Sequence, residues 1–151
     1  MLTLNWPVTV CKLEDNYSSP KSCRLDLPLQ FTIHGLWPQL SQLSSLISYC
    51  KNNKEKFDVK LLGSIFHELD RTWPSAFSDD ATSFWKHEWD KHGTCTSFTM
   101  TKYFHESIAL YNKYPLLEWL QRFDIHPSDT HSYPTGLVAA ALEKHIPKTR
   151  I

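Results

Sequence analysis

One short segment of the chain, residues 83–95, holds four side chains that could move protons or stabilise an anion: His87, Glu88, Lys91 and His92. On a helix, with about 100° per residue, these four side chains fall within an arc of about 140°. Phe84 lies inside the same arc, and Gly93 follows where a left-handed residue would end the helix. A proton donor, a proton acceptor and a cation on one helix face suit acid–base chemistry at an anionic centre.

Two other interpretations of this segment stay open. Mixed charges on a helix often form only a solvated face, and the histidines would then be incidental. A zinc site is the second alternative, but the zincin motif His-Glu-x-x-His places its histidines four residues apart on one face. His87 and His92 are five residues apart, about 140° around a helix, and point too far apart to bind one ion easily. We therefore predict no metal ligands and no cofactor.

Length and composition indicate a globular protein. The 151 residues are enough for one domain with a hydrophobic core, and we expect a single domain over residues 1–151. Lys plus Arg and Asp plus Glu both number 16, so the net charge is zero with His neutral. A protein that depends on many phosphate contacts would be basic, so any nucleic acid must be held at few phosphates. The eight histidines add positive charge below about pH 6.5, which would suit an acidic compartment.

The chain carries four cysteines: Cys11, Cys23, Cys50 and Cys95. Their spacing fits neither a zinc finger nor a Cys-x-x-Cys redox pair. We expect two disulfides in an oxidising compartment, with three pairings possible. Asn16 begins a glycosylation acceptor, Asn-Tyr-Ser, which is consistent with secretion. The sequence has neither a signal peptide nor a membrane-spanning apolar run, so we expect a mature chain without a leader.

Two strands and several helices must position the candidate residues. Strands are predicted over Leu2–Val10 and Leu29–Trp37. In the second strand His34 alternates with apolar residues and should share a face with Thr32. Residues 12–28 are expected to form a loop, and Gln39–Asn53 a loop or a short helix.

Helical periodicity is clear in the rest of the chain. Helices are expected over Phe57–Trp73, over the segment from Ser83 to His92, over Met100–Tyr114, from Pro115 to Phe123, and over Pro134–His145. The first carries an apolar stripe that should face the core: Leu61, Leu62, Ile65, Phe66, Leu69 and Trp73. In the last helix Leu137 and Ala141 should point inward. These elements indicate the α+β class.

Two motifs in combination point to a known family. Phe31–Pro38 reads Phe-Thr-Ile-His-Gly-Leu-Trp-Pro, and Lys86–Cys95 reads Lys-His-Glu-Trp-Asp-Lys-His-Gly-Thr-Cys. Together they resemble the two active-site signatures of the ribonuclease T2 family, which are secreted or lysosomal endoribonucleases. The likeness extends from Leu4 to Lys148, nearly the whole chain. It implies a small antiparallel sheet packed by several helices. It also implies these disulfides: Cys11 with Cys23, and Cys50 with Cys95.

The resemblance assigns catalytic roles to five residues. His92 matches the histidine that takes the proton from the ribose 2′-OH, and His34 matches the one that protonates the leaving 5′-oxygen. His87 matches a phosphate-binding histidine. Glu88 and Lys91 match residues that stabilise the pentacovalent phosphorane.

The resemblance also assigns substrate-binding positions. Trp37 matches an aromatic residue that stacks on the base 5′ to the cut, and Phe84 and Asn5 match positions at the other base site. Gln39 stands where many relatives carry an Asp that contacts the base, so base preference is left open.

Cleavage of RNA through a 2′,3′-cyclic phosphate needs one base, one acid and a cation near the phosphoryl oxygens. The substrate supplies the nucleophile, so we expect single-stranded RNA to be cut and DNA, which lacks the 2′-hydroxyl, to be inert. We expect a monomer that is secreted or lysosomal/endosomal. The chain stops at Ile151, a few dozen residues short of most relatives, so C-terminal strands should be missing. The alternatives are a catalytically impaired shortened isoform and a zinc hydrolase using His87, Glu88 and His92.

Overall fold

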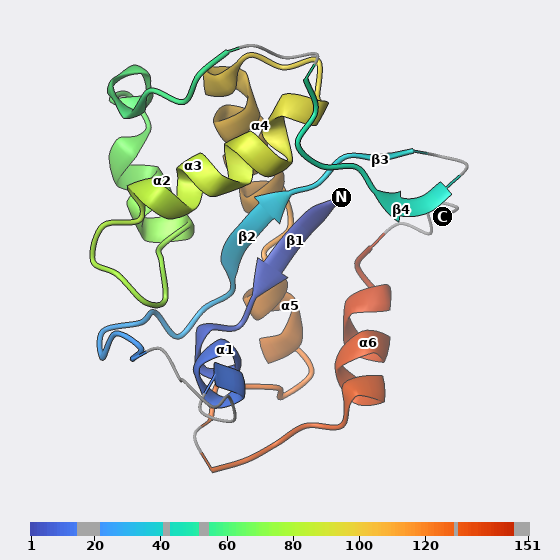
Figure 1. Cartoon of the computed structure of the whole chain (residues 1–151). Helices are drawn as coiled ribbons and strands as arrows, with labels where there is room; N and C mark the ends of the chain where they lie inside the picture. The colour runs from blue at the N-terminus through green and yellow to red at the C-terminus, as the bar shows by residue number, and fades with distance from the viewer. Residues whose placement is uncertain (15–21, 41–42, 52–54, 129, 147–151) are drawn as a thin grey trace. The chain divides into compact units, whose positions relative to one another are not determined.

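The computed structural model describes residues 1–14, 22–40, 43–51, 55–128 and 130–146. The chain divides into two compact units, Met1–Lys113 and Tyr114–Ile151. Each unit is described separately below, and Figure 1 shows their elements. The expectation of one domain over residues 1–151 stays a prediction.

The first unit contains an antiparallel pair of strands, β1 (Leu2–Asn5) and β2 (Thr32–Leu36) (Figure 1). The register pairs Thr3 with Gly35 and then Leu4 with Ile33. His34 is therefore the extra residue of a β-bulge, and bulges commonly redirect one side chain. Both predicted strands are shorter in the structure than the sequence suggested.

The predicted strand Leu2–Val10 is wrong beyond Asn5, because Pro7 begins a helix, α1 (Pro7–Glu14). Proline suits the first turn of a helix, where its missing N–H would have no partner. The Trp6 carbonyl accepts hydrogen bonds from the Thr9 and Val10 amides, at 3.0 and 3.2 Å. Residues 12–14, which were expected in a loop, therefore belong to this helix.

A second pair of strands replaces the loop or short helix that was expected over Gln39–Asn53. β3 (Gln39–Leu40) pairs antiparallel with β4 (Leu43–Leu46). Serine-rich sequence has a weak strand preference, and the pairing partner decides the conformation here.

The predicted helix Phe57–Trp73 is interrupted. It forms a 3₁₀ turn, η1 (Val59–Leu62), followed by a separate helix, α2 (Phe66–Thr72). The break changes the phase of the apolar stripe, so Leu61 and Phe66 are exposed instead of buried. The other four predicted core residues are buried as expected: Leu62, Ile65, Leu69 and Trp73.

The helix that carries the candidate catalytic residues is α3 (Thr82–Lys91), followed by a 3₁₀ turn, η2 (Gly93–Cys95), and by α4 (Met100–Lys113). The aromatic core lies between α3 and α4. Trp89 meets Tyr103 edge-on at 5.6 Å, and Trp73 packs on Phe104 at 5.3 Å. Both α3 and α4 confirm the helices predicted from periodicity.

The second unit contains α5 (Leu116–Gln121) and α6 (Thr135–Glu143), which contact each other. Leu120 and Ala141 are buried. Leu137 is 49% exposed, so its predicted inward position is wrong. The Trp119 and His145 rings stack at 5.0 Å.

Both disulfides implied by the resemblance form in the structure, Cys11 with Cys23 and Cys50 with Cys95. Asn16 lies outside the described residues. No helix in the described parts of the chain has the length and apolar character needed to cross a membrane.

Candidate active site

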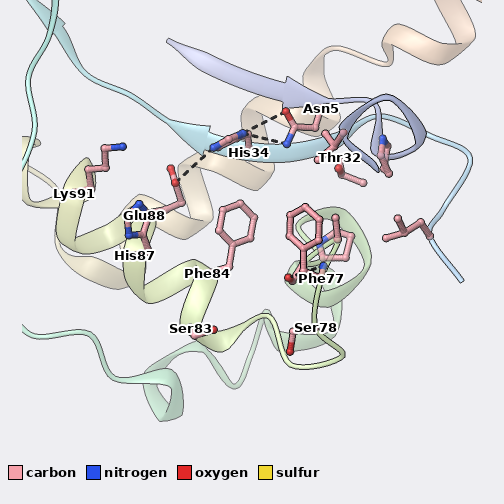
Figure 2. A pocket seen from close by; sticks show the side chains of 16 residues that line it. Asn5, Thr32, His34, Phe77, Ser78, Ser83, Phe84, His87, Glu88 and Lys91 are labelled. Atoms are coloured by element: carbon pink, nitrogen blue, oxygen red, sulfur yellow. Dashed lines mark hydrogen bonds and ion pairs between the residues drawn. The ribbon is translucent and has the colours of Figure 1, made fainter. Parts of the chain in front are cut away.

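His34 projects from the bulge of β2 between polar groups on its two ring nitrogens (Figure 2). Its Nδ1 lies 3.1 Å from Nδ2 and 3.3 Å from Oδ1 of Asn5, the last residue of β1. Its Nε2 lies 3.8 Å from Glu88 Oε1. Trp37 and Phe84 contact the ring at centroid distances of 5.1 and 5.7 Å, and both contacts are edge-to-face. Four side chains therefore fix where this imidazole points.

The helix α3 presents His87, Glu88, Lys91 and Phe84 to one cavity (Figure 2). His92, the other member of the predicted arc, follows the end of α3 and does not line this cavity. The cavity has a volume of about 510 Å³, and His34 lines it too. The opposite side of α3 buries Trp85 and Trp89 in the core, and Lys86 forms an ion pair with Asp90. The amphipathic helix thus separates core residues from candidate catalytic ones. Its polar face lines a cavity and is not simply a solvated surface.

Glu88 is almost fully buried, with 2% of its surface exposed. The indole Nε1–H of Trp37 donates a hydrogen bond to Glu88 Oε2 at 2.9 Å. Burial raises the pKa of Glu88, while the Trp37 hydrogen bond and the Lys91 charge oppose the increase. Gly35 permits this approach, because a Cβ at this position would lie 2.1 Å from Oε2 and 2.5 Å from Nε1.

His92 follows the last turn of α3 and is 2% exposed. Its ring stacks on Trp37 at 5.0 Å, with 28° between the planes. Burial, followed by the charge of Lys91, lowers its pKa to about 4, although the nearby Ile47 backbone opposes this effect. Nδ1 of His92 has no well-aligned hydrogen bond within the described residues. The imidazole lies behind Trp37 and is not part of the cavity lining.

The C-terminal end of α3 is held by two contacts from the segment before it. The Tyr49 amide donates to the Lys91 carbonyl at 2.7 Å, and the neighbouring Cys50 is bonded to Cys95. Tyr49 adopts a φ of 53°, in the left-handed region that few non-glycine residues occupy. Gly93 has no positive φ, so its predicted left-handed role is wrong. Glycine is needed here because a Cβ would lie 2.1 Å from the Trp89 ring.

Burial also lowers the pKa of His34, and the charges of Lys91 and His87 lower it further. The two histidines proposed as acid and base therefore both titrate below their ordinary value of 6.5. The positive charge of Lys91 lowers the pKa of both imidazoles. The site thus combines one partly exposed imidazole, one buried imidazole and a cation.

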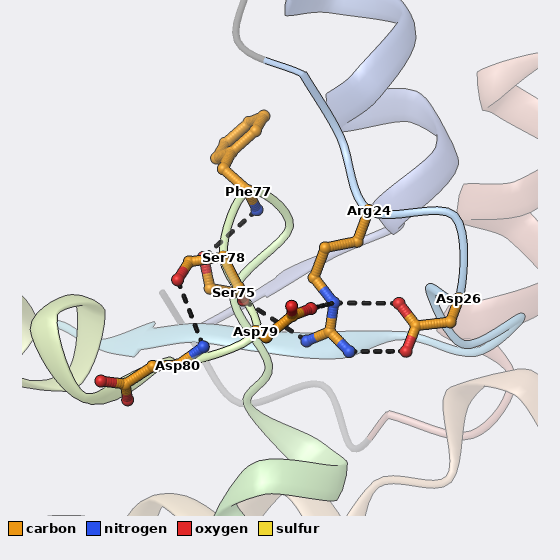
Figure 3. A network of polar contacts seen from close by, with 7 residues as sticks. All are labelled: Arg24, Asp26, Ser75, Phe77, Ser78, Asp79 and Asp80. Atoms are coloured by element: carbon orange, nitrogen blue, oxygen red, sulfur yellow. Dashed lines mark hydrogen bonds and ion pairs between the residues drawn. The ribbon is translucent and has the colours of Figure 1, made fainter.

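Arg24 holds the loop before α3, whose residues 74–78 line the cavity. Figure 3 shows the polar contacts of Arg24 with this loop. Its amide donates to the Ala76 carbonyl at 3.0 Å, and its guanidinium donates to the Ser78 carbonyl at 3.4 Å. The same guanidinium pairs with Asp79 and with Asp26, and these contacts raise the pKa of Arg24 further. Sequence reasoning did not identify this residue. Only its position between two aspartates in the fold reveals its role.

Side-chain caps then carry this loop into α3. Ser75 Oγ accepts from the Phe77 amide, and Ser78 Oγ accepts from the Asp80 amide, both at 3.2 Å. Asp80 Oδ1 accepts from the Thr82 amide at 2.8 Å, one residue before the N-cap Ala81. Ser75, Phe77 and Ser78 line the cavity, although the sequence alone did not single them out as site residues.

The structure brings together most of the predicted site residues. Six line the cavity: Asn5, His34, Phe84, His87, Glu88 and Lys91. Trp37 and His92 lie directly behind them. Gln39 is exposed on β3 and does not line the cavity. Within the described residues, no three His, Cys, Asp or Glu side chains form a group that could hold a metal ion.

Comparison with known proteins agrees with this geometry. The model of the Ribonuclease T2 family matches residues 1–151. The chain belongs to the ribonuclease T2 family. Among T2 relatives, Ribonuclease T2 of Danio rerio is 32% identical over 87% of this chain and 50% of the relative. Ribonuclease Oy of Magallana gigas is 36% identical over 93% of this chain and 66% of the relative.

A solved structure of the T2 family confirms the α+β fold with its small antiparallel sheet and several helices. RNase NT in complex with 5′-AMP superposes with a TM-score of 0.79 at 26% identity, covering 95% of this chain and 70% of that protein. The chain spans half to about two thirds of the length of the two curated T2 relatives.

Proposed function

We propose that this chain is an endoribonuclease that cuts single-stranded RNA by metal-free transesterification through a 2′,3′-cyclic phosphate. One observation carries the proposal: a cavity joins His34 of β2 to His87 and Lys91 of α3. Glu88 connects the two elements, with Oε1 3.8 Å from His34 Nε2. A T2 relative of known structure holds 5′-AMP, which is consistent with an RNA substrate.

In this mechanism His92 accepts the proton of the ribose 2′-OH, and the resulting O2′ attacks phosphorus. The P–O5′ bond breaks, and His34 delivers its Nε2 proton to O5′. A pKa of about 4 keeps His92 neutral and able to accept a proton over most of the pH range. Lys91 and His87 offset the negative charge of the phosphoryl oxygens, and Glu88 assists in stabilising the phosphorane.

The aromatic residues supply the base sites in this proposal. Trp37 stacks on the base 5′ to the cut, which requires its ring to leave His92, where it now rests at 5.0 Å. Phe84 and Asn5 contact the other base from within the cavity. Gln39 contributes a base contact only if β3 lies along the bound strand. We further propose a monomeric, single-domain enzyme that leaves DNA intact and is secreted or lysosomal/endosomal.

The test is incubation of the purified, oxidised chain with single-stranded RNA and with DNA of the same sequence, in chelator, at about pH 5 and pH 7. The variants His34→Ala and His92→Ala run in parallel. The expected result is RNA with cyclic-phosphate ends, intact DNA and a loss of about a hundred- to ten-thousand-fold in both variants.

The alternative functions predict different results in this cleavage experiment. No cleavage by a chain that unfolds cooperatively would replace the proposal with a non-catalytic member of the family. No cleavage together with non-cooperative unfolding would indicate an impaired, shortened isoform. Activity that chelator abolishes and zinc restores would favour the zinc hydrolase.

A further inference from the structure

The two nitrogens of His34 face different surroundings (Figure 2). Nε2 points to Glu88 and to the cavity shared with His87 and Lys91. Nδ1 faces the side-chain amide of Asn5, with Nδ2 at 3.1 Å and Oδ1 at 3.3 Å. The nitrogen that faces the cavity is therefore the one that Asn5 does not touch, and of the two amide atoms only Oδ1 can accept a hydrogen bond from a protonated Nδ1.

We infer that Asn5 is a positioning residue that keeps Nδ1 of His34 protonated, so that Nε2 is the nitrogen that exchanges protons with the substrate. The inference rests on the proposed ribonuclease function. It adds a role to Asn5, whose resemblance-based assignment is only to a base site.

The protons balance through both steps of the reaction. In the imidazolium, Nδ1–H donates to Asn5 Oδ1 and Nε2–H faces the phosphate. When Nε2 gives its proton to O5′, the neutral ring retains Nδ1–H and the same hydrogen bond. In hydrolysis of the cyclic phosphate, the Nε2 lone pair takes a proton from water, the new P–O bond forms, and the P–O2′ bond breaks. O2′ then receives the proton that His92 acquired in the first step, and Asn5 needs no rearrangement.

The backbone places Asn5 and His34 together for this purpose. The bulge omits His34 from the register, while Asn5, at the end of β1, pairs with Thr32. Trp37 and Phe84 contact the His34 ring edge-on and hinder its rotation. A ring flip would exchange the two nitrogens, and Asn5 adds a hydrogen bond that favours one of the two orientations.

The side chain that contacts Nδ1 of His34 is an uncharged amide and not a carboxylate, and this difference affects the protonation of His34. The charged or titratable groups that act on His34 are Lys91, His87, His92 and Glu88. The Asn5 amide orients the ring without adding a charge. A carboxylate at this position would favour the imidazolium and keep His34 protonated to higher pH. An amide therefore leaves His34 able to release its proton.

The experiment is ¹⁵N NMR of the histidine rings in the full chain, which reports the tautomer and pKa of His34 without requiring activity. His34→Ala identifies the signals. The test variants are Asn5→Asp and Asn5→Leu, and kcat and KM for a dinucleotide are measured across pH. The control is Thr3→Val on the same strand, because the Thr3 hydroxyl is buried and has no hydrogen-bond partner in the described structure.

We expect the neutral ring of the unsubstituted chain to carry its proton on Nδ1. Asn5→Asp should raise the pKa of His34 by about one unit or more, and the alkaline limb of the kcat/KM profile should move with it. Asn5→Leu should lower kcat by about tenfold through loss of a hydrogen bond to a charged group, and the Nδ1–H tautomer should lose its dominance. Thr3→Val should change neither quantity.

The inference is wrong if the tautomer and pKa of His34 are the same in Asn5→Asp, Asn5→Leu and the unsubstituted chain. It is also wrong if Nε2 carries the proton in the neutral ring of the unsubstituted chain. If Asn5→Leu does not fold, the tautomer of the unsubstituted chain and the shift in Asn5→Asp still decide. Expected NMR shifts in a chain that cuts no RNA would reject the ribonuclease proposal alone.

Discussion

At the level of single residues, Glu88 connects the two halves of the site. Its carboxylate is buried, with one oxygen near His34 Nε2 and the other accepting from Trp37. A buried carboxylate is costly unless donors satisfy it. The indole therefore has a structural role that is independent of its proposed contact with a base.

Trp37→Phe tests this role, because phenylalanine preserves an aromatic ring beside His92 and removes the N–H that Glu88 accepts. We expect the free energy of unfolding to fall by about 1–3 kcal/mol, the usual cost of leaving a buried group unsatisfied. Urea denaturation measures it. The Glu88→Gln and Trp37→Phe/Glu88→Gln variants complete a double-mutant cycle. Additive effects in that cycle would contradict the coupling.

The two histidine pKa values predict an acidic optimum for cleavage. His92 acts as a base in its neutral form, so activity should rise as pH increases through about 4. His34 acts as an acid in its protonated form, so activity should fall as pH increases through a pKa that lies below 6.5. The kcat/KM of the unsubstituted chain, which reports the pKa values of the free enzyme, should therefore peak between these limits. A maximum above neutral pH would reject this pair of histidines as the acid and the base.

At the level of elements, the spacing between β2 and α3 depends on Gly35. A methyl group at this position would meet both Glu88 and Trp37, and both are packed within the site. The distance between β2 and α3 therefore depends on residue 35 having no side chain. Because the surrounding residues are closely packed, an added methyl group would force β2 or α3 to move.

Gly35→Ala should lower the free energy of unfolding by about 1–3 kcal/mol through overpacking, and lower kcat as Glu88 and Trp37 move. Gly136→Ala in α6 is the matched control, since no atom lies within 4 Å of the position that its added methyl group would occupy. The control should be stabilised by up to about 1 kcal/mol, because alanine favours a helix. Equal responses of the two variants in thermal unfolding would show that the close approach at Gly35 is unimportant.

Periodicity predicted α3 and α4 well because each buries one continuous face, whereas other elements depend on contacts distant in sequence. Pro7 falls inside the predicted strand Leu2–Val10, although proline is well suited to start a helix, and the local pattern does not distinguish the two. The His34 bulge arises from pairing with β1, which no single strand sequence encodes. The sequence around Arg24 did not predict its structural role, because its partners Ala76 and Asp79 are more than fifty residues away in the chain.

At the level of the whole molecule, the two disulfides should differ in their contributions to stability. Cys50 and Cys95 are separated by 45 residues, and Cys11 and Cys23 by 12. Chain-entropy arguments assign about 4 kcal/mol to the longer loop and about 3 kcal/mol to the shorter one. Replacing each pair by serine should therefore cost more at Cys50–Cys95 in urea denaturation.

The Cys50–Cys95 disulfide should also matter more for activity than Cys11–Cys23, because it holds the end of α3 where Lys91 and His92 lie. The Cys11–Cys23 pair is the control, since its cysteines lie away from that end of α3. Cleavage is measured in buffer where both variants remain folded. A larger loss of kcat in the Cys11/Cys23 variant than in the Cys50/Cys95 variant would contradict the role assigned to the Cys50–Cys95 disulfide.

The net charge of zero at neutral pH predicts a weak dependence of RNA binding on salt. For single strands, the logarithm of affinity falls with the logarithm of salt concentration by about 0.7 for each phosphate neutralised. With Lys91 as the cation that neutralises a phosphate, the slope should be about 0.7 at pH 7. It should be steeper at about pH 5, because histidines then gain positive charge.

The measurement is binding of a non-cleavable 2′-O-methyl strand at several salt concentrations. Lys91→Met should reduce the slope at both pH values, whereas Lys102→Met, on α4 over the Phe98 ring, should not. A slope that is steep at pH 7, or unaffected by Lys91→Met, would show that the strand follows an extended basic surface outside this cavity.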